Sequence, residues 1–187
     1  MEALSLTTPL DTETVRNLQA GDSVLLNGVI YTARDAAHQR LVESADAGRP
    51  LPFPIRGQVL YYVGPAPAPP GWAVGPAGPT TSGRMDPYTP RLLELGLKGM
   101  IGKGSRSAGV IEAMKRHDAV YFGAVGGAAA LVAKSVTGVE IVAYEDLGPE
   151  AVYRFTVSHL PLTVLIDCQG RNLYVTGPEK YHRQNQA

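Results

Sequence analysis

The sequence predicts a mixed α/β domain, and three observations lead to that prediction. The chain has 187 residues, a length that fits one domain and allows a buried core. In its middle part, short β-rich runs alternate with stretches of strong helix formers. Towards its end, β-rich runs flank a turn, as is typical of a hairpin. We therefore expect a single domain over residues 1–187, with mixed sheets and packed helices.

The charge and hydropathy of the chain argue against two classes of partner. Seventeen basic residues balance seventeen acidic ones, so the formal net charge is zero. Nucleic acids and acidic membrane surfaces select proteins with a basic excess, so we expect neither partner. The first residues lack the basic and apolar segments of a signal peptide. No uncharged apolar stretch reaches the ~20 residues needed to span a bilayer.

The cysteine and histidine content argues against a metal or cluster held by this chain alone. The one cysteine, Cys168, cannot form an internal disulfide, so we expect a cytoplasmic protein. An iron–sulfur cluster needs three or four thiolates, which one cysteine cannot supply. No histidine is spaced for metal binding with another histidine or with Cys168.

The elements that justify the fold class begin with a short helix and two strands. Asp11 or Thr12 can cap a helix near the start of the chain. Gly28 interrupts a β-rich run and predicts a bulge or a close backbone contact. In order, we expect a short helix within 7–18, a strand over 23–32, a helix over 33–47 and a strand over 58–63.

A long irregular stretch with eight prolines follows, over residues 64–90. Prolines at this density exclude both a helix and a central strand. Such a long stretch in a compact domain is usually functional or disordered. Its first half, over 65–76, is typical of a stiff spacer. Its second half is rich in hydroxyl groups, and we place the chemistry there.

Strands and helices alternate through the rest of the chain. Thr89 can cap a helix with Pro90 at its first position, and Ser105 or Ser107 can begin another. We expect helices over 91–95, from 105 or 107 to 117, and over 126–134, and strands over 97–101, 119–122 and 138–144. Beyond these we expect β-rich runs over 152–158 and 162–167, a turn at 168–170, a returning strand over 172–175 and a loose tail from about 177.

The turn Gly102-Lys103-Gly104 is a candidate anion-binding site. It is not a phosphate-binding loop, because Leu97 stands where the first glycine is needed and Gly104 follows the lysine. The dinucleotide fingerprint also fails, because Ser107 replaces the third glycine. A lysine between a strand end and a helix start nevertheless lies where ligands of α/β sheets bind. The alternative interpretation is a surface lysine in a tight turn.

Arg84 is a second candidate, within the segment 78–86, which has three neighbouring hydroxyl residues. A guanidinium can hold a carboxylate through two parallel hydrogen bonds. Backbone N–H groups and hydroxyls around it can orient the same ligand. The alternative is a solvated loop in which Arg84 pairs with Asp86.

Arg34 is a third candidate, at the start of the predicted helix over 33–47. A positive charge is unfavourable at a helix N-terminus unless it faces an anion. The alternative is an exposed residue that pairs with Asp35 or Glu43. His38 lies on the same helix face and either borders this site or is buried in a hydrogen-bonded role.

Four segments together resemble the β subunit of class I, iron–sulfur-dependent fumarate hydratase and its relative L-tartrate dehydratase. The resemblance covers most of the chain and implies a swivelling β/β/α domain. It implies a partner α subunit that holds a [4Fe–4S] cluster, in an α2β2 assembly. The segments are TARDAAHQR (32–40), GPTTSGRMDPYTPRLLELGLKGMIGKGSRS (78–107), YFGAVGGAAALVAKSV (121–136) and AYEDLGPEAVYRFTV (143–157).

The resemblance also implies a site of four residues in this chain. Arg34, Arg84 and Lys103 match residues that bind the substrate carboxylates and the region of the C2 hydroxyl. Thr80 matches a threonine proposed to transfer a proton at C3, together with a carboxylate from the α subunit. Ser105 departs from the Asn that many relatives have, which affects local hydrogen bonding in the loop.

The implied activity is a hydro-lyase that interconverts fumarate and (S)-malate and is active only with the α subunit. The first alternative is the β subunit of an L-tartrate dehydratase, which converts tartrate to oxaloacetate. The second is a non-catalytic dicarboxylate-binding module that has lost its catalytic partner. A neighbouring reading frame with three cluster-binding cysteines would separate the two enzymes from the module.

Overall fold

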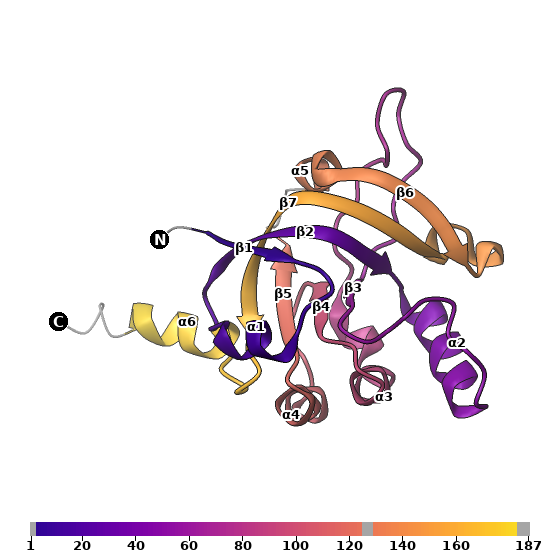
Figure 1. The fold of residues 1–187 in the computed structure, drawn as a ribbon. Helices are drawn as coiled ribbons and strands as arrows, with labels where there is room; N and C mark the ends of the chain where they lie inside the picture. Colours follow the sequence, from indigo (N-terminus) through magenta and orange to yellow (C-terminus); the bar gives the residue numbers. More distant parts are fainter. Residues whose placement is uncertain (1–2, 125–128, 183–187) are drawn as a thin grey trace.

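The computed structural model describes residues 3–124 and 129–182, which form a mixed α/β fold with packed helices (Figure 1). The strands are β1 (Leu4–Thr7), β2 (Ser23–Thr32), β3 (Val59–Tyr61), β4 (Gly99–Gly102), β5 (Val120–Ala124), β6 (Val136–Ala143) and β7 (Val152–Ile166). The helices are α1 (Thr12–Asn17), α2 (Asp35–Asp46), α3 (Thr89–Glu94), α4 (Ala108–His117), α5 (Ala129–Ser135) and α6 (Leu173–His182), with 3-10 turns η1 (Ser82–Met85) and η2 (Glu145–Glu150).

Five of these strands close into a small barrel-like ring. Strands β2, β3, β4 and β5 are parallel neighbours, and β7 runs antiparallel to both β5 and β2. The ring closes because β7 is long enough to pair with both of these strands. Strand β1 extends the sheet beside β2, and β6 extends it beside β7. Helices α2, α3 and α4 lie together on one side, opposite α5 (Figure 1).

The side chains of the ring divide between two hydrophobic cores. Along β3, Val59 and Tyr61 belong to one cluster of buried residues, whereas Leu60 and Tyr62 belong to the other. This alternation follows from the period of two in a strand, which sends neighbouring side chains to opposite faces. The first cluster combines residues from β2, β5 and β7, and the second joins the ring to α2, α3 and α4. Both faces of the central strands are therefore buried.

Several local predictions are confirmed. Asp11 caps α1, and its carboxylate accepts a hydrogen bond from the Thr14 N–H (2.7 Å). Ser107 caps α4, and its hydroxyl oxygen accepts from the Val110 N–H (3.4 Å). The register of β2 against β7 shifts between Leu26 and Gly28, as the predicted bulge requires.

The structure corrects the expectations for both ends of the chain. Strand β1 was not among the predicted elements. The β-rich runs over 152–158 and 162–167 form one strand, β7. Instead of a returning strand over 172–175 and a loose tail, residues 173–182 form α6, and only an isolated bridge between Ile166 and Asn172 follows the hairpin pattern. Residues 183–187 of the expected tail, and residues 126–128 of the expected helix over 126–134, lie outside the described residues.

The helix after the irregular stretch begins differently from the prediction. Its N-cap position is Tyr88, and Thr89 is its first helical residue. The Thr89 hydroxyl is buried, donates to the Met85 carbonyl (2.8 Å) and accepts from Arg106 Nη2 (2.8 Å), so it serves these two contacts and does not cap the helix. Within the irregular stretch, the Tyr61 hydroxyl donates to the Ala77 carbonyl, which ties this stretch to the ring.

Candidate anion-binding site

The carboxyl ends of three parallel strands bring predicted site residues to one edge of the ring. Because β2, β3 and β4 are parallel neighbours, they end on the same side. Arg34 follows β2, and Lys103 follows β4. Thr80 joins this edge from the irregular stretch, because its N–H donates to the Tyr62 carbonyl, one residue beyond β3 (2.7 Å). The fold therefore gathers three residues that are far apart in the sequence.

Backbone contacts attach the segment after Thr80 to the turn that carries Lys103. Thr81 forms a parallel bridge with Lys103, and the Ser82 N–H donates to the Lys103 carbonyl (2.9 Å). A side chain at Gly102 would collide with the Ser82 hydroxyl, so this close approach requires glycine. Arg84 lies in η1, directly after this segment. All four predicted residues therefore start from adjoining pieces of backbone.

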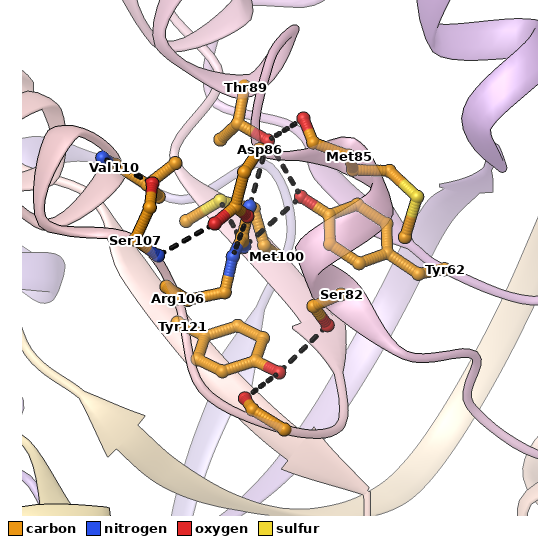
Figure 2. A network of polar contacts seen from close by, with 11 residues as sticks. Tyr62, Ser82, Met85, Asp86, Thr89, Met100, Arg106, Ser107, Val110 and Tyr121 are labelled. Atoms are coloured by element: carbon orange, nitrogen blue, oxygen red, sulfur yellow. Dashed lines mark hydrogen bonds and ion pairs between the residues drawn. The ribbon is translucent and has the colours of Figure 1, made fainter.

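The buried side chains of Tyr121 and Ser82 contact each other through their hydroxyl groups (Figure 2), and Tyr121 also contacts the turn that carries Lys103. The Tyr121 hydroxyl donates to the Gly104 carbonyl (3.0 Å) and lies 2.8 Å from the Ser82 hydroxyl oxygen. Because Tyr121 uses its one proton on Gly104, Ser82 donates to Tyr121. Burial raises the pKa of Tyr121, which keeps the phenol protonated and able to donate.

Arg106 is a buried structural residue that the sequence analysis missed. Its Nε donates to one oxygen of the Asp86 carboxylate (2.7 Å), and the Ser107 N–H donates to the other (2.6 Å). Its Nη2 donates to the Thr89 hydroxyl (2.8 Å), and its guanidinium faces the Tyr121 ring (5.1 Å to the centroid). Figure 2 shows these contacts joining the segment around η1 to the start of α4. This network therefore holds the segment that follows Arg84 against the segment that follows Lys103.

The network also bears on the alternative interpretation of Arg84. Asp86 pairs with Arg106, so the pairing of Asp86 with Arg84 that this alternative included is wrong. Arg84 and Lys103 are both exposed. Among residues 3–124 and 129–182, neither has an ion-pair partner, which leaves two uncompensated positive charges at this edge. Two such charges on adjoining segments are groups that can bind an anionic ligand.

Arg34 is the N-cap residue of α2, and it lies near carboxylates of this chain, one of them Asp35, as its alternative interpretation expected. Its Nη2 lies 3.1 Å from a Glu150 carboxylate oxygen, and its Nε lies 3.9 Å from Asp35. Glu150, which precedes β7, was not an expected partner. These carboxylates offset the unfavourable position of the arginine at the positive end of the helix. In this structure Arg34 is therefore already paired, unlike Arg84 and Lys103.

His38 has the buried, hydrogen-bonded role that was one of its two interpretations. Its side chain is fully buried, and its Nδ1 lies 2.9 Å from the Arg34 carbonyl oxygen. Burial lowers the pKa of His38 to about 4, so the ring is neutral near pH 7. A neutral ring next to a carbonyl oxygen donates from Nδ1–H. The ring packs edge-on against Tyr62, with centroids 5.1 Å apart.

Tyr174 is a second residue near the site that the sequence analysis missed. The Gly104 N–H donates to its hydroxyl oxygen (3.0 Å), so α6 reaches the Lys103 turn. A cavity of about 300 Å³ lies here, lined by Lys103, Thr163, Tyr174 and their neighbours. No signal in the sequence marked this contact, because residues 172–175 were expected to form a strand.

The described part of the chain holds neither a metal-binding cluster nor a membrane-spanning helix. Within residues 3–124 and 129–182, no group of three or more His, Cys, Asp or Glu side chains is placed to hold a metal ion. The helices in these same ranges are too short or too polar to traverse a bilayer. Cys168 is buried, and burial raises the pKa of its thiol.

The chain is similar in sequence to known proteins along most of its length. The model of the family described as "Fumarase C-terminus" matches residues 1–177. Fumarate hydratase 2 of Leishmania major is 41% identical over 156 residues, which are 82% of this chain and 28% of that protein. The aerobic class I fumarate hydratase of Escherichia coli K12 is 42% identical over 151 residues, which are 80% of this chain and 28% of that protein.

A shorter relative matches along most of its length. The putative L(+)-tartrate dehydratase subunit beta of Methanocaldococcus jannaschii is 37% identical over 166 residues, which are 86% of this chain and 85% of that protein. This chain thus spans about 28% of the two fumarate hydratases but most of a separate β subunit. The match over residues 1–177 shows that this chain belongs to the Fumarase C-terminus family.

Proposed function

We propose that this chain is the β subunit of a class I hydro-lyase that interconverts fumarate and (S)-malate. The observation that carries the proposal is the convergence of Arg34, Thr80, Arg84 and Lys103 on adjoining segments at one sheet edge. In this proposal the chain acts as one swivelling domain over residues 1–187. It is active in an α2β2 assembly in the cytoplasm, where the α subunit completes the site.

The proposed chemistry assigns charge stabilisation to this chain. Arg34, Arg84 and Lys103 bind the carboxylates of the substrate. Removal of the C3 proton adds negative charge to the adjacent carboxylate, so cations fixed before the reaction stabilise the transition state more than the substrate. The Thr80 hydroxyl carries the proton, together with a carboxylate from the α subunit. A threonine hydroxyl is a weak base and needs such a partner.

The iron–sulfur cluster of the proposed enzyme belongs on the partner. A [4Fe–4S] cluster is held by thiolates, and this sequence has one cysteine, Cys168. The donor set of this chain therefore does not fit the cluster. We propose that the α subunit holds it and that this chain contributes the groups that bind the dicarboxylate.

An L-tartrate dehydratase is the second candidate, and one observation favours it. The tartrate dehydratase β subunit of M. jannaschii is the relative named here that this chain covers nearly in full, at 85% of its length. Both reactions act on a four-carbon dicarboxylate, so both require the same pair of carboxylate-binding groups. They differ in the C3 hydroxyl of tartrate, which the site must also accommodate.

The test is an anaerobic assay of this chain, alone and co-purified with its candidate α partner, against fumarate and L-tartrate. We expect activity only in the complex, with fumarate preferred. A preference for tartrate selects the second candidate, and an inactive complex with a loaded cluster rejects both. The Arg84→Ala variant should lose about 100-fold or more of the activity, because it removes a transition-state contact. Arg116→Ala, an exposed arginine near the end of α4, is the matched control.

A further inference from the structure

The ion pair between Arg34 and Glu150 lies at the candidate site and is partly shielded from water. Its side chains are 23% and 28% exposed, and Nη2 and Oε1 are 3.1 Å apart. Shielded pairs are screened by salt less than surface pairs. The contact uses one guanidinium nitrogen, and arginine has five N–H donors. Because Nε is buried and lies 3.9 Å from an Asp35 carboxylate oxygen, the terminal nitrogens supply the donors that are left for a substrate carboxylate.

The backbones of the two partners are tied together by a buried threonine. The Thr32 hydroxyl donates to the Ala151 carbonyl (3.4 Å) and accepts the Tyr153 N–H (3.1 Å). Thr32 lies two residues before Arg34, and Ala151 directly follows Glu150. Thr32 has no exposed surface, so these bonds are protected from water. The separation of the arginine and the glutamate is therefore set by the fold.

The side chain of Arg34 also lies in a narrow slot. A Cβ atom at Gly64 would lie 3.4 Å from both Cδ and Nη1 of Arg34, and 3.2 Å from the Pro149 carbonyl oxygen. Gly64 thus leaves space for the arginine stem beside the segment that carries Glu150. Packing on one side and the carboxylate on the other restrict the orientation of the guanidinium.

We propose that Glu150 is a positioning residue that orients the Arg34 guanidinium for the dicarboxylate. This inference rests on the proposed function of the site. A flexible arginine loses side-chain entropy when it binds a ligand, and a fixed carboxylate partner removes part of that cost beforehand. Loss of Glu150 should therefore weaken substrate binding while the chemical step proceeds at nearly the same rate.

The structure contains a matched control pair on the same two segments. Arg40 of α2 binds Asp146 of η2 through two hydrogen bonds of 2.8 and 2.6 Å. These side chains are more exposed, at 39% and 64%. Removal of Asp146 therefore breaks an ion pair between α2 and η2 and leaves the contacts of Arg34 intact.

The experiment compares Glu150→Ala, Glu150→Gln and Asp146→Ala in the complex with the α partner. We expect Glu150→Ala to raise the KM for fumarate and the inhibition constant of succinate about tenfold, with kcat within about threefold. Glu150→Gln, which keeps the shape of the side chain but removes its charge, should restore only part of this loss, because the contact with Nη2 is an ion pair. Asp146→Ala should leave KM unchanged. In an Arg34→Lys background, Glu150→Ala should add less than about twofold, because the two residues act together.

Two results would overturn the positioning role. One is a KM for Glu150→Ala equal to that of Asp146→Ala, which would make the ion pair irrelevant to binding. The other is a lower KM, which would mean that Glu150 competes with the substrate for Arg34. An inactive wild-type complex would remove the proposed function and this inference together, whereas an active complex with either result removes the inference alone.

Discussion

Replacement of Arg106 by leucine should destabilise the chain strongly, because it removes one partner of a buried ion pair. The Arg106 side chain is fully buried, and that of Asp86 is 14% exposed. Leucine would leave the Asp86 carboxylate with the Ser107 N–H but without its cation. Removing one partner of a buried pair costs about 3–5 kcal/mol. For a chain of this length, that cost lowers Tm by about 12 °C, at about 3 °C per kcal/mol.

The assay is thermal unfolding of the purified chain, followed by circular dichroism. The matched control is Arg16→Leu, because Arg16 also donates to an aspartate, Asp118, through two hydrogen bonds but is 65% exposed. We expect the control to change Tm by less than about 2 °C, as is typical of surface pairs. The double variant Arg106→Leu, Asp86→Leu should recover part of the loss, because it leaves no unpaired charge in the interior.

A fall in Tm of less than about 3 °C for Arg106→Leu would refute this reasoning. It would mean that water or a rearranged loop compensates Asp86 in place of the arginine. An equal fall in Tm for the single and double variants would also contradict it. The destabilisation would then come from lost packing and not from the unpaired Asp86 carboxylate.

Two further predictions concern stability. The pKa of His38 is about 4 in the folded chain, below its ordinary value, so the unfolded chain binds its proton first as the pH falls. Between pH 7 and pH 5, the free energy of unfolding of the wild type should therefore fall by about 2 kcal/mol more than that of His38→Asn, as measured by urea unfolding. Equal falls in the two proteins would contradict this prediction. Gly102→Ala should lower the free energy of unfolding by about 2 kcal/mol, because the added methyl group collides with Ser82. Gly109→Ala, in open space on α4, should raise it by about 0.5 kcal/mol. Equal effects of the two variants in the same unfolding assay would argue against the collision.

Local signals in the sequence predicted the features that depend on neighbouring residues. Asp11 and Ser107 were each one of two residues expected as a helix cap, and one glycine in a β-rich run predicted a bulge or a close backbone contact at Gly28. These features depend on hydrogen bonds or backbone angles within a few residues. The glycine–lysine–glycine turn was likewise recognised as lying between a strand and a helix.

Features that depend on distant partners were not predicted. Arg106 stands in a polar, glycine-rich segment that is typical of an exposed loop, and its partner Asp86 is 20 residues away. Glu150 meets Arg34 only because β7 returns to pair with β2. Tyr174 was expected in a strand, because short β-rich runs do not reveal their final pairing. Arg34, Arg84 and Lys103 were candidates from the residues themselves, whereas Thr80 was named through the resemblance. The catalytic roles of all four stay predictions.

The long strand β7 also has a consequence for how the protein is made. Ser23 of β2 pairs with Thr163, which a ribosome adds about 140 residues later. Until then, β2 and β5 have exposed edges, and such edges invite pairing with other chains. Pairings between distant segments form slowly, because a long loop must close first. Until its last strand closes the ring, the nascent chain therefore carries two unpaired strand edges that are available to other chains.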